Sequence, residues 1–83
     1  MKRFQVIGFG LMPVGESDTL RGAKMVASSF TAPMPNGTTY KPNIYLATDC
    51  VEDGFVRPIG GAKPCSVWDG KTWEDFSPVF GEL

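Results

Sequence analysis

The chain has 83 residues and no histidine. Histidine is the usual general base near neutral pH and the commonest metal ligand in proteins. Its absence excludes nucleophilic triads of the Ser-His and Cys-His kinds. We therefore expect no enzyme activity and no cofactor, with carboxylate chemistry as the one catalytic alternative left open.

Cysteine is scarce as well, with only Cys50 and Cys65 in the chain. Two cysteines are too few for the disulfide framework of a small secreted protein. Nor do two thiolates complete a structural zinc site without two further ligands. The two thiols could meet across neighbouring strands, but the favoured interpretation is that they are small, buried or half-buried thiols.

Long apolar runs are also missing. The longest, from Val6 to Val14, is broken by glycine and proline, and it is far shorter than the roughly 20 residues that a membrane-spanning helix needs. No positively charged, apolar leader opens the chain. We therefore expect no membrane partner and a cytoplasmic location.

The residues that are present suffice for one small core, since 42 % are hydrophobic and 12 % are aromatic. A chain of this length usually forms one domain, so we expect a single domain over residues 1–83, with 77–83 as a candidate extended tail. Small domains have a thin stability margin. A homodimer or a higher homo-oligomer is therefore an open alternative.

The formal net charge of −1 hides an uneven distribution. Residues 1–41 carry five basic and two acidic side chains, whereas residues 42–83 carry three basic and seven acidic ones. Such a charge asymmetry can steer a partner of opposite sign, although a solvated surface is the more common meaning.

The first half of the chain predicts one strand followed by one helix. Apolar residues alternate on both sides from Arg3 to Met12, which indicates a strand that Pro13 and Gly15 end. Ser17 or Asp18 is a suitable N-cap. From Thr19 to about Phe30 the apolar side chains recur at spacings of three and four, which is typical of a helix that packs on a sheet; they are Leu20, Ala23, Ala27 and Phe30.

The second half predicts an antiparallel meander. A loop from Thr31 to Pro42 precedes strands over 43–49 and 55–59, and a last hairpin surrounds Asp69-Gly70-Lys71, the strongest turn signal in the chain. The fold class is therefore α+β, with one helix on a mainly antiparallel sheet of four or five strands, in the order strand, helix, strand, strand, strand and one further strand.

Several residues are candidates for binding. Asp49, Glu52 and Asp53 cluster at a turn, where metal binding and catalysis are weaker interpretations than ordinary turn chemistry. Aromatic residues on an open sheet face can stack nucleic-acid bases; the candidates are Tyr45, Phe55, Trp68 and Trp73. Their strands are acidic, whereas phosphate contact usually needs a basic groove. Any contact with nucleic acid is therefore expected to be indirect or weak.

Two short motifs carry a resemblance. The segment from Leu20 to Ser28 has the pattern L-x-x-A-K-x-x-A-S, and the segment from Gly70 to Asp75 has the pattern G-K-x-W-x-D. In this order, after one strand, they resemble the helix and final hairpin of small phage-type proteins, including anti-CRISPR inhibitors of type I-F surveillance complexes. The resemblance implies that Lys24 and Lys71 contact the partner, although the proline-rich segment 31–42 and the segment 60–64 depart from the pattern.

The resulting hypothesis is a small non-catalytic inhibitor, encoded by a phage or another mobile element, that binds a host protein complex and blocks its nucleic-acid site. An acidic surface would occupy a basic groove of the target. The alternative is a structural or assembly component of a phage particle that forms a homo-oligomer. The predicted partner-binding residues are Lys24, Asp49, Glu52, Asp53, Trp68, Lys71, Trp73, Glu74 and Asp75.

Overall fold

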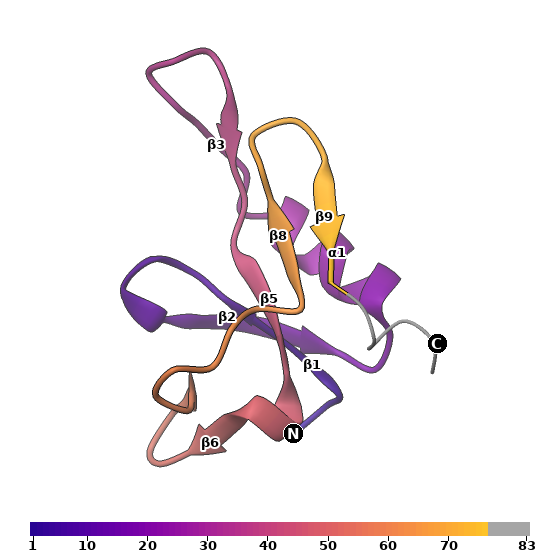
Figure 1. The fold of residues 1–83 in the computed structure, drawn as a ribbon, viewed down its shortest axis with the longest axis vertical. Coiled ribbons are helices and arrows are strands. Elements are labelled where there is room, and N and C mark those ends of the chain that lie inside the picture. Colours follow the sequence, from indigo (N-terminus) through magenta and orange to yellow (C-terminus); the bar gives the residue numbers. More distant parts are fainter. Residues whose placement is uncertain (77–83) are drawn as a thin grey trace.

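The computed structural model describes residues 1–76. Within them, one α-helix and a mainly antiparallel sheet make an α+β fold, as the sequence predicts (Figure 1). The tail predicted at 77–83 lies outside the described residues. The elements are β1 (Phe4–Ile7), η1 (Phe9–Leu11), β2 (Pro13–Ser17), α1 (Leu20–Ser28), β3 (Ala32–Pro33), β4 (Thr39–Tyr40), β5 (Asn43–Leu46), η2 (Ala47–Asp49), β6 (Cys50–Glu52), β7 (Val56–Pro58), β8 (Ser66–Trp68) and β9 (Trp73–Asp75).

The main sheet has five strands in the order β2-β1-β5-β8-β9, and all its pairs are antiparallel. Strand β1 lies inside this sheet, and all four of its residues are buried. Burial on both faces agrees with the two-sided apolar pattern of the sequence. Strands β3 and β4 form one small separate sheet, and β6 and β7 form another.

The prediction of one strand from Arg3 to Met12 is wrong. The chain reverses after Ile7, where the Gly8 N–H donates to the Met12 carbonyl at 2.7 Å and the Leu11 N–H donates to the Gly8 carbonyl at 3.1 Å. Gly10 has φ of 69°, which an L-residue adopts only at a steric cost. Because Gly10 permits this reversal, the segment forms two strands, and Pro13 and Gly15 belong to the second strand instead of ending the first.

Gly15 allows β2 and α1 to approach closely. A Cβ at this position would overlap the Cγ1 atom of Val26 on the helix. A glycine in a strand often marks such a close approach. Gly15 therefore makes room for the helix, whereas Gly8 and Gly10 form the turn.

The helix agrees with the prediction except at its ends. Thr19 is the N-cap, with its hydroxyl accepting a hydrogen bond from the Gly22 N–H at 3.0 Å, so neither Ser17 nor Asp18 holds that position. Leu20, Ala23 and Ala27 are buried. Phe30 lies beyond the last helical residue and is 46 % exposed.

The predicted strands over 43–49 and 55–59 differ from the structure in extent and pairing. Strand β5 ends at Leu46, a turn of 3-10 helix follows, and β7 pairs only with β6. In the main sheet, β5 pairs with β1 on one edge and with β8 on the other. The β6–β7 hairpin therefore cannot pair with β5. The β6–β7 hairpin instead covers part of the sheet face opposite α1.

The core accordingly has two parts. On the helix side, buried apolar residues of β1, α1 and β5 pack together with Cys65; they are Phe4, Val6, Leu20, Ala23, Ala27 and Ile44. On the other side, Ile7, Tyr45 and Cys50 pack with Val56 of the β6–β7 hairpin. The final hairpin is confirmed, with Trp68 opposite Trp73 and Ser66 opposite Asp75.

Candidate functional site

The two tryptophans of the final hairpin pack on each other. Their ring centroids lie 5.6 Å apart, with an angle of 68° between the planes. The Trp68 indole N–H lies 3.1 Å from the Thr39 carbonyl oxygen and 3.0 Å from its hydroxyl, and donates to them. Because Trp73 also packs against the helix-side core, both rings are held as half-buried structural groups.

Lysines lie over both rings. The Lys41 Nζ atom is 4.1 Å from the centroid of Trp68, and the Lys24 Nζ atom is 5.9 Å from that of Trp73. Such cation–π contacts stabilise a ring and occupy one of its faces. Stacking of a nucleobase on these faces would first have to displace the lysines. Of the other aromatic candidates, Tyr45 is buried and Phe55 is 51 % exposed.

Lys24 and Asp75 bind each other. Lys24 Nζ lies 2.9 Å from Asp75 Oδ2, and the buried Ser66 hydroxyl donates to Asp75 Oδ1 at 2.6 Å. Burial raises the pKa of Asp75, but the hydrogen bonds from Ser66 and Lys24 and the lysine charge outweigh it, so that the pKa is lowered. Two predicted partner-binding residues therefore link α1 to β9.

Lys71 and Glu74 are exposed on the same hairpin. The turn before them is fixed by Asp69, whose Oδ1 accepts the backbone N–H groups of Lys71 and Thr72, each at 2.8 Å. The bond from the Thr72 N–H, followed by that from Lys71, lowers the pKa of Asp69. Asp69 thus fixes the turn by bonds within four residues of sequence.

The acidic residues of the other hairpin form a separate group. Asp49 ends η2, Glu52 ends β6, and Asp53 follows in the turn. Arg57 Nη2 lies 3.4 Å from Asp53 Oδ2, in a pair with a 78 % exposed carboxylate. Figure 1 shows β6 at the opposite end of the molecule from the β8–β9 turn, so the predicted acidic residues form two groups and not one continuous surface.

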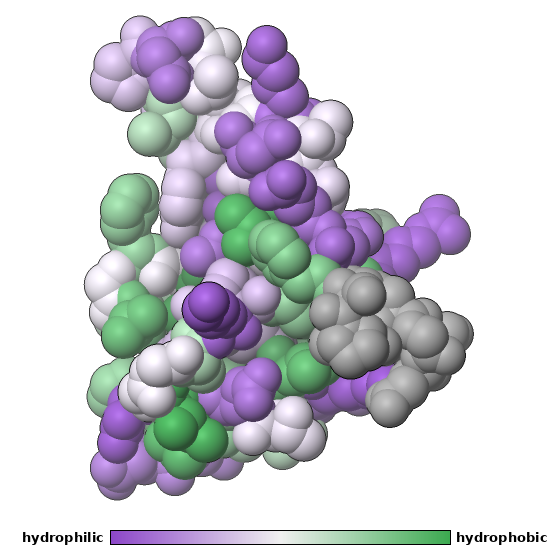
Figure 2. All heavy atoms as spheres, in the orientation of Figure 1, coloured by the Kyte–Doolittle hydropathy of each residue, from purple (hydrophilic) through white to green (hydrophobic). Residues whose placement is uncertain are grey.

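An apolar surface that the sequence reading missed lies around the turn between β1 and β2. Phe9, Leu11 and Met12 are 76 %, 52 % and 60 % exposed. Phe9 stacks on Tyr40 with ring centroids 4.8 Å apart. We call the exposed side chains here the apolar patch; they are Phe9, Leu11, Met12, Phe30 and Met34. Figure 2 shows apolar side chains at this edge of the molecule.

The apolar patch borders a shallow hollow of about 470 Å³. The hollow is lined by Phe9, Met12, Phe30, Met34 and Tyr40, among others. Leu11 lies at the tip of the turn with φ of 60°, a left-handed conformation that is rare for a residue other than glycine, asparagine or aspartate. The sequence signal for this turn is the pair Gly8 and Gly10, which lies inside the segment predicted as one strand.

The cysteines lie in different parts of the core, both buried and both as free thiols. Burial raises the pKa of Cys65 to about 11, and burial, followed by the charge of Asp49, raises the pKa of Cys50. The favoured interpretation of small buried thiols is therefore confirmed. No group of three or more Cys, Asp or Glu side chains within residues 1–76 is arranged to hold a metal ion.

Comparison with protein-family models, with curated proteins and with solved structures finds no match for this chain. The one α-helix within residues 1–76 is too short to cross a membrane. The functional argument therefore rests on the residues themselves.

Proposed function

We propose that this protein is a small non-catalytic module that acts by binding another protein in a fixed ratio. The observation that supports this most is the apolar patch, where large side chains are exposed on a turn that contains a left-handed leucine. An exposed apolar surface favours association, and backbone strain persists mainly where it serves contact or catalysis.

The narrower proposal is that the target is a host nucleic-acid-binding defence complex, such as a CRISPR–Cas surveillance complex. One support is the resemblance of the helix and the last hairpin to those of type I-F anti-CRISPR inhibitors. The other is the acidic group at the β6–β7 hairpin, which consists of Asp49, Glu52 and Asp53. Within residues 1–76, neither Asp49 nor Glu52 forms an ion pair. This group would occupy a basic groove that otherwise holds nucleic acid. Such a target acts in the bacterial cytoplasm, where the proposal also places this protein.

The test is a titration of a purified type I-F surveillance complex, bound to labelled target DNA, with this protein. We expect DNA binding to fall to a plateau at a fixed molar ratio. Reversing two charges, in the Glu52→Lys/Asp53→Lys variant, should weaken inhibition, and more so at low salt. Glu74→Lys reverses one charge on the other hairpin, and the weakening per reversed charge shows which of the two hairpins contacts the target.

An unchanged DNA affinity in excess protein would contradict this target. Equal inhibition by the double variant would contradict the role of the acidic group. The apolar patch also supports the alternative, a homo-oligomeric component of a phage particle. Light scattering on the eluting protein separates the two: we expect a monomer or dimer, whereas a large symmetric ring would favour the particle component.

A further inference from the structure

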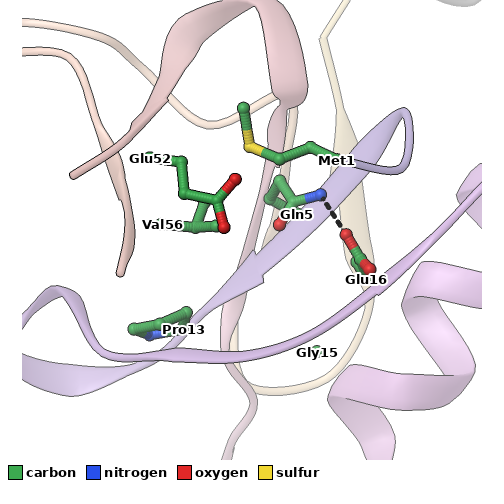
Figure 3. A pocket seen from close by; sticks show the side chains of 7 residues that line it. All are labelled: Met1, Gln5, Pro13, Gly15, Glu16, Glu52 and Val56. Atoms are coloured by element: carbon green, nitrogen blue, oxygen red, sulfur yellow. Dashed lines mark hydrogen bonds between the residues drawn. The ribbon is translucent and has the colours of Figure 1, made fainter. Parts of the chain in front are cut away.

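A second pocket, with a volume of about 350 Å³, lies between the β1–β2 hairpin and the β6–β7 hairpin (Figure 3). Its polar lining comes from three different strands, with Gln5 on β1, Glu16 on β2 and Glu52 on β6. Its apolar walls are the side chains of Met1, Pro13 and Val56. The pocket thus combines oxygen acceptors with hydrocarbon.

Gln5 is the informative residue, because it is polar and only 2 % exposed. Its amide nitrogen donates to the Lys2 carbonyl oxygen at 2.7 Å and to Glu16 Oε1 at 2.9 Å. Both partners are acceptors, so they fix which side of the amide carries the nitrogen.

The Gln5 amide oxygen is consequently directed away from Glu16. Figure 3 shows it on the side that faces Glu52 and Val56. Within residues 1–76, Gln5 uses its amide nitrogen for both of these hydrogen bonds, and no fully buried side-chain oxygen lacks a partner. The amide oxygen of Gln5 therefore faces the pocket as an acceptor for a bound group.

The carboxylates add negative charge beside this oxygen. The hydrogen bond from Gln5, followed by that from the Lys2 backbone N–H, lowers the pKa of Glu16, and the charges of the N-terminal amine and Lys2 act in the same direction. The ion pairs Lys24–Asp75 and Arg57–Asp53 involve neither Glu16 nor Glu52. The side chains that line the pocket offer acceptors without a lysine, an arginine or a histidine among them.

We propose that this pocket binds a guanidinium or primary ammonium group carried on an aliphatic chain. The cation would donate to the Gln5 amide oxygen and to the carboxylates of Glu16 and Glu52. Its hydrocarbon stem would lie along Pro13 and Val56, as lysine and arginine stems do on apolar surface. The source is an arginine or lysine side chain of a partner protein or a free polyamine. The inference rests on the proposed function only in that Glu52 belongs to the acidic group.

The test uses the ¹⁵N-labelled full chain, titrated at constant ionic strength with arginine blocked at both ends and followed by NMR. Gln5 is the sole glutamine of the sequence, so its side-chain amide signals report on the pocket directly. We expect saturable shifts of these signals, with a dissociation constant on the order of 1 mM. Blocked citrulline, which has nearly the same shape without the charge, should not saturate.

Glu52→Gln keeps the size of an exposed side chain, so that folding is preserved while binding weakens by about five- to tenfold. Glu74→Gln is the matched control and should bind as the original protein does. Tighter binding of spermidine than of blocked arginine would identify a polyamine as the ligand, whereas equal or weaker binding would favour a partner side chain.

Three results would overturn the inference. They are the absence of saturable shifts, equal affinity of the Glu52→Gln variant, and shifts of the same signals at lower concentrations of Mg²⁺ than of blocked arginine. Because the probe is a small molecule and no target complex is present, these results are independent of whether the protein inhibits DNA binding.

Discussion

The ammonium group of Lys24 lies 2.9 Å from Oδ2 of Asp75, across 51 residues of sequence. Both residues were expected to contact a partner. In the structure they join the helix to the last strand, with the Ser66 hydroxyl as a second donor to Asp75. A charged side chain on a helix face and one on a strand thus form an internal contact that neither local pattern reveals.

The first prediction concerns this contact. Asp75→Ala leaves the buried Ser66 hydroxyl without its acceptor, so we expect a loss of about 1–2 kcal/mol of unfolding free energy and a melting temperature lower by roughly 4–16 °C. The ion pair itself adds little, because solvent screens the 36 % exposed Asp75 side chain. Glu74→Ala removes the neighbouring carboxylate and leaves the bond between Ser66 and Asp75 intact, so it is the control. Equal melting temperatures of the two variants would contradict the prediction.

The second prediction concerns pH. The pKa of Asp75 is lowered in the folded protein, so the folded state favours the ionised carboxylate. The resulting stabilisation is fully present above the ordinary aspartate pKa and is lost as the pH falls through the folded value. We expect the difference in melting temperature between the original protein and Asp75→Asn to shrink between pH 6 and pH 3. Glu16 and Asp69, whose pKa values are also lowered, contribute equally to both proteins. A difference in melting temperature that stays constant with pH would contradict the prediction.

The third prediction concerns the contact between β2 and α1. Gly15→Ala places a methyl group against Val26, and we expect it to destabilise the protein by about 1–3 kcal/mol. Val26→Ala removes the opposing group. In a double-mutant cycle by urea unfolding, Gly15→Ala should therefore cost less in the Val26→Ala background. Strict additivity of the two changes would show that the helix does not limit the size of residue 15.

The fourth prediction concerns the turn of the apolar patch. Leu11 is exposed and has φ of 60°, a conformation that asparagine tolerates better than leucine does. Leu11→Asn should raise the unfolding free energy by about 0.5–1 kcal/mol and weaken target binding if the patch is the contact. Leu11→Ala keeps the strain and serves as the control. A lower stability of Leu11→Asn than of Leu11→Ala would be incompatible with relieved strain.

The fifth prediction concerns the thiols. The pKa of Cys65 is raised to about 11, and that of Cys50 is raised as well, so both remain protonated near pH 8 and react slowly with a disulfide reagent. We expect almost no reaction of the folded protein within minutes and the release of two equivalents in guanidinium chloride. Rapid reaction of the folded protein would contradict the burial of these residues; Cys50→Ser and Cys65→Ser would show which thiol is accessible.

Local patterns sufficed for the parts of the fold that neighbouring residues control. The three-and-four spacing of Leu20, Ala23 and Ala27 predicts a one-sided helix, and burial of these three residues confirms it. The Asp69-Gly70 turn predicts the last hairpin, because the Asp69 carboxylate and the Gly70 φ of 109° act within four residues. The absence of histidine was likewise a fact of the sequence alone.

Only the tertiary structure decided which of these elements meet. The sequence pattern of 3–12 predicts one strand, whereas the hydrogen bonds around Gly10 divide the segment into two. The tertiary structure also separates Glu52 from Glu74 and pairs Lys24 with Asp75. It brings Gln5, Glu16 and Glu52 together from three strands. Periodicity fixes which side of a strand a residue occupies, whereas contacts between distant segments depend on strand order and pairing, which no local pattern contains.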